Sequence, residues 1–210
     1  MAGATIERVR YRGLMPRSGA DARRRLQQAA LELYGERGFD RTTTAEIAAR
    51  AGLNERTYFR HFADKREVLF DGEADLRATL TAAVAEAPDG LPPFEILLSA
   101  FRRAGRILER NRPFSEPRLA VIAATPALRE RELTKNASLT AAVAEALRQR
   151  GVTTRLAELA AGTGWAAFHH AAQAWIDDPS ESLDVHLDRA FGDLHTLAAE
   201  ITVGQEVSGR

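Results

Sequence analysis

Two short helices joined by a tight turn are indicated around residue 50, and this feature limits the fold more than any other. Thr43 can cap a helix through its hydroxyl, while Glu46, three residues later, reaches back to complete a capping box. Gly52 suits the left-handed conformation of a sharp turn, and Asn54 is a preferred N-cap for a second helix that begins at Glu55. The apolar face of the first helix consists of Ile47, Ala48 and Ala51. The pattern therefore predicts a helix-turn-helix.

A helix-turn-helix of this kind is suited to DNA, because its second helix enters the major groove while the first crosses the phosphate backbone. Arg56 and Arg60 can each pair bidentately with guanine, and Thr57 can reach a phosphate or a thymine methyl. His61 and Lys65 are suited to phosphate oxygens. Helix pairs with a glycine in the turn are also common in all-helical proteins, so the motif alone leaves a purely structural role open.

A longer pattern runs through and beyond this stretch. It consists of Thr44, Ile47, Ala48, Ala51, Gly52, Leu53, Thr57, Phe59, His61, Phe62, Lys65 and Leu69. This pattern is similar to the signature of the tetracycline-repressor (TetR) family of bacterial transcription regulators. The length of the match makes it a specific signal.

The chain departs from that signature at two positions of the second helix. Arg56 stands where the family often has glycine, which adds a base contact and suggests a particular operator. Phe59 stands where the family often has tyrosine, so one phosphate ligand is lost. Tyr58 next to it either replaces that ligand or is half-buried against the first helix. Glu55 either accepts a hydrogen bond from cytosine or repels phosphate. The expected DNA-binding residues are Thr43, Thr44, Glu55, Arg56, Thr57, Tyr58, Arg60, His61 and Lys65.

The charge of the chain is unevenly distributed although its formal total is zero. Residues 1–70 hold 14 Lys and Arg against 9 Asp and Glu, which leaves 15 against 20 for the remainder, so the two parts carry +5 and −5. A basic N-terminal third fits DNA binding. The absence of cysteine excludes disulfides, thiol catalysis and Cys-ligated zinc. No apolar run approaches the roughly 20 residues that span a bilayer, and we expect a cytoplasmic protein.

Residues 1–20 combine glycine and proline with arginine and show no sustained periodicity, which predicts a flexible basic arm. Such arms lie in the minor groove or along phosphates, and a solvated tail is the alternative. We expect the first helix to run from Asp21 to Arg37 and to end at Gly38. Three arginines at 23–25 lie where the helix dipole disfavours positive charge. They indicate either a nearby anion such as a DNA phosphate or a solvated cluster.

The remainder of the chain predicts helices throughout, and the fold class is all-α with about nine helices. Asp64 is expected to cap a helix from Lys65 to about Glu86, with Glu67 in the return position. Five more helices are expected between Pro93 and Ala199. The expected domains are an arm at 1–20, a helix-turn-helix unit at 21–70, a helical effector-binding and dimerisation unit at 71–203, and a tail at 204–210.

The last two helices, expected at about 154–176 and 181–200, are rich in small and apolar residues respectively. The resemblance implies that they pair with a second copy as a four-helix interface, and a symmetric dimer is what a palindromic operator requires. The alternative is that they only complete the core of a monomer. The expected interface residues are Ala160, Gly164, Ala167, Ala171, Leu187, Phe191, Leu194 and Ala198.

The resemblance further implies a small-molecule effector that binds among the middle helices and shifts the spacing of the two recognition helices. The expected pocket residues are Phe94, Leu97, Phe101, Arg102, Phe114, Leu119, Ile122, Trp165, Phe168 and His169. Arg103, Arg106 and His170 are the further polar groups available to it, and these cations suggest an anionic or acyl ligand.

Two other functional classes compete with a homodimeric repressor that a small molecule releases from a palindromic operator. One is an enzyme, but His169 and His170 are neighbours on a helix and point about 100° apart, which suits no shared metal ion. The familiar catalytic motifs are absent. We therefore expect no enzyme activity, no metal and no cofactor. The other rival is an architectural or adaptor protein that binds DNA without an effector.

Overall fold

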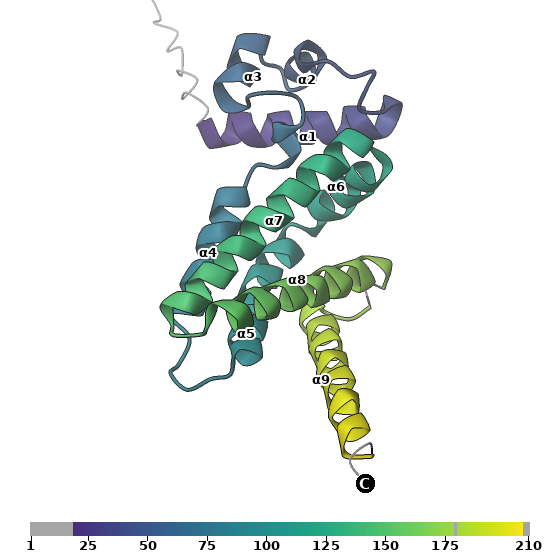
Figure 1. Ribbon diagram of the computed structural model, residues 1–210. Coiled ribbons are helices and arrows are strands. Elements are labelled where there is room, and N and C mark those ends of the chain that lie inside the picture. The colour runs from purple at the N-terminus through teal and green to yellow at the C-terminus, as the bar shows by residue number, and fades with distance from the viewer. Residues whose placement is uncertain (1–18, 179, 208–210) are drawn as a thin grey trace, which may run out of the picture.

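The computed structural model describes residues 19–178 and 180–207, and the only regular secondary structure in this part of the chain is helical (Figure 1). The predicted all-α class is confirmed. The helices are α1 Gly19–Arg37, α2 Thr44–Arg50, α3 Glu55–His61, the short 3₁₀ helix η1 Glu67–Leu69, α4 Glu73–Ala85, α5 Pro93–Arg110, α6 Arg112–Ala124, α7 Pro126–Gln149, α8 Thr154–Asp177 and α9 Leu183–Val207. Most of the expected basic arm, residues 1–18, and the end of the expected tail lie outside the described residues.

The recognition unit, which we define as α1 to η1, lies at one end of the molecule (Figure 1). Its core is formed by fully buried side chains that include Leu26, Ile47 and Tyr58. Residues from outside the unit join the same core, among them Ile122 of α6 and Leu128 of α7. The recognition unit therefore shares apolar packing with the rest of the chain instead of hanging from a linker.

The prediction of one helix from Lys65 to Glu86 is wrong for the first half of that range. Asp64 Oδ1 accepts hydrogen bonds from the backbone N–H groups of Arg66 at 2.7 Å and Glu67 at 3.2 Å, but it caps only the short η1 turn. Gly72 then adopts φ 92°, a left-handed conformation, and α4 begins at Glu73. Glycine accepts this conformation without the clash that a Cβ would cause, so the chain turns here between η1 and α4.

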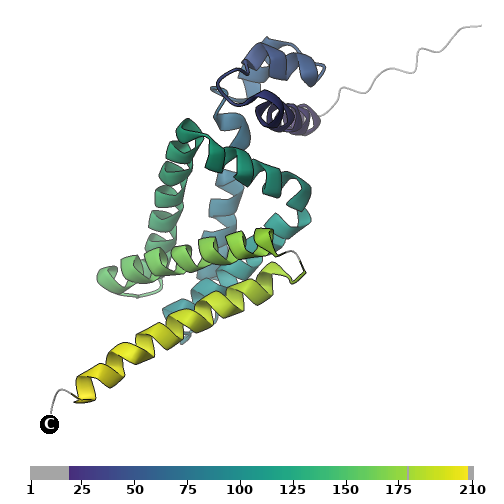
Figure 2. The ribbon, with the colours of Figure 1, turned by 90° about the vertical axis from the view of Figure 1, so that its right-hand side faces the viewer.

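The second unit, which we define as α4 to α9, buries a separate core. Figure 2 shows α9 extending away from the recognition unit, with α8 alongside its N-terminal part. The breaks expected at residues 112–113, 125–126, 151 and 178–179 all fall where one helix gives way to the next. Helix α9 begins at Leu183, two residues later than expected.

The small residues of α8 face inward, so the expected dimer interface is wrong in part. A Cβ added at Gly164 would lie 3.0 Å from Leu97 Cδ1 and 3.2 Å from Phe101 Cε2, both on α5. These small residues let α8 approach α5 closely, so the buried ones among them are covered by the chain itself. The expected interface residues that are buried inside the chain are Ala160, Gly164, Ala167, Ala171 and Leu187. Phe191, Leu194 and Ala198 remain half-buried or exposed on α9.

Candidate nucleic-acid interface

Helix α2 begins with the capping box expected from the sequence. Thr43 Oγ1 accepts from the backbone N–H of Glu46, and Glu46 Oε2 accepts from the backbone N–H of Thr43 at 2.9 Å. These hydrogen bonds from Thr43 hold the pKa of the Glu46 carboxyl below its usual value. The carboxylate also accepts from the Thr43 hydroxyl at 2.8 Å, so that hydroxyl already has a partner inside the unit.

The turn between α2 and α3 also forms as the sequence predicts. Gly52 adopts φ 65°, and Asn54 Oδ1 accepts from the backbone N–H of Thr57 at 2.8 Å, which caps α3. Arg25 of α1 donates to the carbonyl of Ala51, just before the turn. A Cβ at Gly52 would lie 2.7 Å from Arg25 Nη2, but that guanidinium ends a flexible side chain, so it is the positive φ that favours glycine here. The angle between α2 and α3 is therefore fixed by local contacts.

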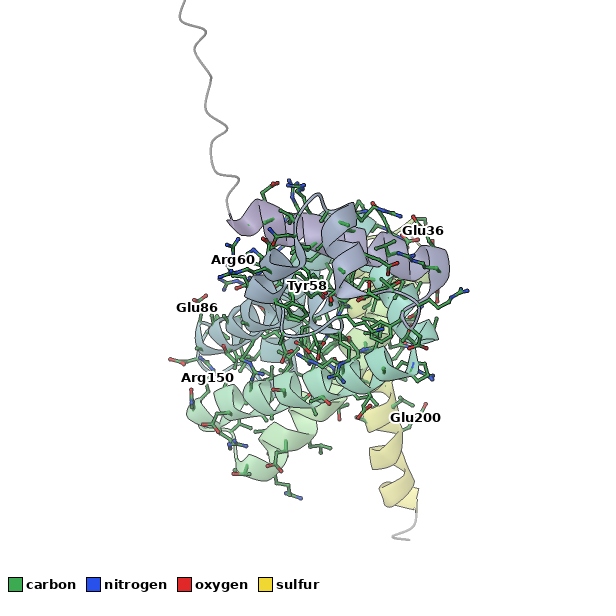
Figure 3. All side chains as sticks on the ribbon, turned by 90° about the horizontal axis from the view of Figure 1, so that it is seen from above. Glu36, Tyr58, Arg60, Glu86, Arg150 and Glu200 are labelled. Carbon is green, nitrogen blue, oxygen red and sulfur yellow. The ribbon has the colours of Figure 1, made fainter. Side chains whose placement is uncertain are left out.

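One face of α3 presents an aromatic ring beside two arginines. Arg56, Phe59 and Arg60 are all exposed, and their three- and four-residue spacing places them on one side of the helix. Figure 3 looks down on this end of the molecule, with Arg60 at its edge. The exposed fraction of Phe59 is 53 %, which is high for a phenyl group. The two arginines were expected here, whereas Phe59 was taken only as the loss of a tyrosine hydroxyl. Its apolar ring at a helix surface is the signal that identifies it as part of the face.

Glu55 is held by a residue of the neighbouring helix. Thr44 Oγ1 of α2 donates to Glu55 Oε1 of α3 at 2.5 Å, so two of the expected DNA-binding residues bond to each other across the turn. Thr57 Oγ1 likewise donates to Asn54 Oδ1 at 3.0 Å. These contacts orient the side chains at the start of α3 before any ligand arrives.

Tyr58 was expected either at a phosphate or half-buried, and the structure buries it completely. Its exposed fraction is 0 %, and its hydroxyl donates to the carbonyl of Asp64 at 3.0 Å. Burial raises the pKa of the phenol above its ordinary value. Tyr58 is labelled in Figure 3 within the body of the recognition unit. The assignment of Tyr58 to the DNA contacts is therefore wrong, because its side chain is part of the core.

Lys65 is largely committed to contacts inside the recognition unit. Its Nζ donates to the carbonyl oxygens of Phe39 at 2.9 Å and Thr42 at 3.3 Å, and it lies 4.1 Å from the centroid of the Phe39 ring. Two of its three N–H groups are thus used to hold the loop between α1 and α2. This geometry favours a role in shaping the unit over the freely reaching phosphate ligand expected from the sequence.

His61 is half-buried at the end of α3. Burial lowers the pKa of its imidazole, and the positive charges of Arg23 and Arg60 lower it further. The ring is therefore neutral at pH 7 and offers a hydrogen bond without a charge. Its Nε2 atom is buried and has no hydrogen-bond partner within the described part of the chain.

The arginines at the start of α1 have carboxylate and carbonyl partners within the unit. Arg24 pairs with Asp21 at 2.9 Å, and Arg23 pairs with Asp71 at 3.4 Å. Together with the bond of Arg25 to the turn, these contacts compensate much of the unfavourable position near the helix N-terminus. The side chain of Arg24 is still 79 % exposed and remains available to a polyanion.

The residues expected to line an effector pocket are divided between several places. Leu97, Phe101, Trp165 and Phe168 pack together in the core of the second unit, where the rings of Phe101 and Phe168 stack at 4.9 Å. The indole Nε1 of Trp165 is buried there without a partner among the described residues. These four predicted pocket residues therefore pack against one another as core side chains. Phe114 and Ile122 belong instead to the core of the recognition unit.

The remaining expected pocket residues lie nearer the surface. Phe94 lines an apolar groove of about 340 Å³ between α5 and α9. Arg102 bonds to the carboxylate of Asp188, and exposed His169 places Nε2 3.4 Å from Asn136 Nδ2. Leu119 is half-buried on α6.

Two features that belong to other classes of function are absent from the described residues. They contain no group of three or more histidine or acidic side chains placed to hold a metal ion. Their helices include none that is both long enough and apolar enough to span a membrane.

Both units match families of known proteins. Residues 26–71 match the family described as "Bacterial regulatory proteins, tetR family", and residues 91–199 match the "MftR C-terminal domain". The chain is 35% identical over 96 residues to the HTH-type transcriptional regulator TcmR of Streptomyces glaucescens, a match that covers 45% of this chain and 42% of TcmR. The chain therefore spans less than half the length of that relative.

Longer matches cover nearly the whole chain. The Mycobacterium tuberculosis protein MftR, named for the regulation of mycofactocin biosynthesis, is 27% identical over 190 residues, which cover 84% of this chain and 94% of MftR. The crystal structure of a transcriptional regulator from Rhodococcus sp. Rha1 is similar with a TM-score of 0.51 and 25% identity, covering 81% of this chain and 94% of that one. The chain belongs to the tetR family of bacterial regulatory proteins.

Proposed function

We propose that this chain is a sequence-specific, DNA-binding transcription regulator that acts as a homodimeric repressor. The observation that carries the proposal is the face of α3 formed by Arg56, Phe59 and Arg60, which is exposed on a helix fixed at its start by a cap and a turn. Two guanidinium groups beside an apolar ring match the edges of guanine and the methyl of thymine in the major groove. The membership in the tetR family supports the same conclusion.

Each side chain of the face has a distinct role in this proposal. Arg56 and Arg60 donate to guanine N7 and O6, and Phe59 contacts a thymine methyl beside them. A phosphate is bound from the flank by Arg24, which is exposed. Thr43 keeps its hydrogen bonds to Glu46 and holds the start of α2 in place. His61 adds an uncharged hydrogen bond. The internal bonds of Glu55 and Lys65 keep the face in shape.

The dimer that a palindrome requires uses the outer surfaces of α8 and α9 in this proposal, not the inner surface first expected. Exposed large apolar side chains gather on these two helices, where partner-covered residues belong. They are Leu156, Leu159, Val185 and Leu197. Half-buried Phe191 and Leu194 line the groove beside them. A small-molecule effector would act by favouring a state of the dimer whose two recognition helices no longer match the operator.

Genomic DNA provides the test of this function. The purified protein is incubated with sheared genomic DNA at a fixed physiological salt concentration, and the retained fragments are sequenced, because salt strongly affects nonspecific binding. We expect one or a few palindromic sequences. Uniform retention of all fragments would favour an architectural protein, and no retention would reject DNA binding. Arg103→Ala, which removes an exposed arginine of α5 far along the chain from the face, is the control for loss of charge.

A further inference from the structure

A cage of charged side chains surrounds the ring of Phe70 where the recognition unit meets the second unit. Phe70 follows η1 directly and is 4 % exposed. The cations of Arg118, Arg131 and Lys135 lie 5.2, 4.8 and 5.7 Å from the centroid of its ring. Each distance is within the range of cation–π attraction. Three cations on one buried ring, contributed by α6 and α7, form the densest charged cluster around any aromatic residue described.

Three carboxylates balance the cations of the cage. Arg131 donates to Glu67 of η1 at 2.7 Å and to Glu73 of α4 at 2.9 Å. Glu132 of α7 accepts from Lys135 at 2.6 Å and from Arg118 at 3.2 Å. Every formal charge in the cage therefore has an opposite partner, as buried charges require.

Arg118 joins the two units through the backbone. Its Nε donates to the carbonyl of Leu69, in η1, at 2.5 Å, and its side chain is only 15% exposed. Burial lowers the pKa of the Arg118 guanidinium, and the adjacent Glu132 opposes that shift. Burying a guanidinium group costs free energy. The position of Arg118 at the junction is therefore explained better by the geometry that its hydrogen bonds impose than by stability alone.

The cage differs in kind from the apolar packing at the same junction. Ile122 and Leu128 also touch the recognition unit, but apolar contact has no preferred direction and allows neighbouring surfaces to slide. Charge-assisted hydrogen bonds are directional, and those of Arg118 and Arg131 tie η1 and the first turn of α4 to α6 and α7. The cage is thus suited to fix the angle of the recognition unit on the second unit.

We propose that Phe70 and its cage, with Arg118 at the centre, position the recognition unit so that the two α3 helices of a dimer are held at one separation. The inference rests on the proposed function, because separation has meaning only for a dimer on a two-part operator. Arg118, Arg131 and Lys135 contact no DNA in this proposal and act through η1 and α4.

Operators with altered spacing test the proposal. The captured palindrome is resynthesised with one or two base pairs added to or removed from its centre. Each base pair shifts a half-site by about 3.4 Å and turns it by about 35°, so a rigid dimer discriminates sharply. We expect the wild-type protein to lose about tenfold or more in affinity on each altered operator. Arg118→Met should reduce this loss to about threefold or less while retaining binding to the original operator.

Two further variants make the experiment decisive. Phe70→Leu removes the ring but keeps every ion pair, so it tests the cage even where Arg118→Met does not fold, and it should also flatten the dependence on spacing. Arg148→Met on α7 breaks an exposed pair with Glu145 and should leave the dependence unchanged. Circular dichroism and thermal melting confirm that each variant is folded.

The outcomes separate the two proposals. Cage variants that weaken binding equally at every spacing, with the sharp optimum preserved, would overturn the positioning role alone. A wild-type protein that binds an isolated half-site as tightly as the full palindrome would overturn the dimeric regulator, and the cage proposal with it.

Discussion

At the scale of single residues, Phe59 is the apolar side chain on a face of α3 whose other members are charged. The exposure of Arg56 and Arg60 needs no binding partner to explain it, since arginines are common at protein surfaces. An exposed phenyl group, in contrast, costs hydration free energy. Contact with a thymine methyl recovers that cost on binding. The residue scale is therefore where the structure adds most to the sequence, which indicated the arginines but not the ring beside them.

Replacing thymine by deoxyuracil tests Phe59, because the substitution removes only the C5 methyl group. On the captured operator, one thymine in each half-site should lower the affinity of the wild-type protein by about three- to tenfold when replaced. Phe59→Ala should bind thymine and deoxyuracil operators equally. Phe59→Tyr, which keeps the ring, should retain the preference for thymine. If no single deoxyuracil position distinguishes wild-type protein from Phe59→Ala, the role assigned to the ring is wrong.

At the scale of elements, the sequence predicts helices whose ends have a local chemical cause. The capping box at Thr43, the turn at Gly52 and the cap at Asn54 depend on residues within three or four positions, and all three form. The break at Gly72 was missed, because a glycine within an apolar helical pattern does not by itself reveal a positive φ. The fold class and most helix ends were thus predictable from local signals.

The neighbour that covers a given face of a helix could not be predicted from local signals in the same way. A stripe of small residues allows close approach to any neighbour, and periodicity does not say whether that neighbour is α5 or a second copy. Burial of Gly164 against Leu97 and Phe101 shows that it is α5. The predicted pocket residues are dispersed for a related reason, because several of the large apolar ones pack into two separate cores.

Two glycine substitutions test the close packing of α8 against α5. Gly164→Ala places a methyl group 3.0 Å from Leu97 and should lower the free energy of unfolding by about 1 to 3 kcal/mol through overpacking. Gly35→Ala on α1 is the matched control, since a Cβ there meets nothing within 4 Å. It should raise stability by about 0.5 to 1 kcal/mol through helix propensity. Urea unfolding measures both. Equal stabilisation by the two changes would contradict the inward orientation of α8.

At the scale of the whole molecule, the two units are joined by both apolar packing and the charged cage at Phe70. The recognition unit carries the face that is proposed to meet DNA, and the outer surfaces of α8 and α9 are proposed to join two copies. The separation of the two recognition helices then depends on all the contacts that lie between the recognition unit and the proposed dimer surface. No single helix determines that separation.

A charge introduced on the outer surface of α8 tests the dimer. Leu159 is 65% exposed, and Leu159→Glu should shift the protein from dimer to monomer in sedimentation velocity, because a carboxylate would be buried without a partner in the interface. Leu133→Glu alters a side chain of similar exposure, 69%, on α7 and should leave the dimer intact. Dissociation by both variants, or by neither, would show that the interface lies elsewhere.

The central claim is that the exposed face of α3 reads a DNA sequence, and the ratio of operator affinity to random-DNA affinity measures it most directly. At one fixed salt concentration, Arg56→Ala should lose about 1 to 3 kcal/mol on the captured operator and relax the preference at one base pair, with little change on random DNA. Arg103→Ala should retain the wild-type ratio. If Arg56→Ala weakened both DNAs equally and kept the ratio unchanged, α3 would contribute charge alone and the account would be contradicted.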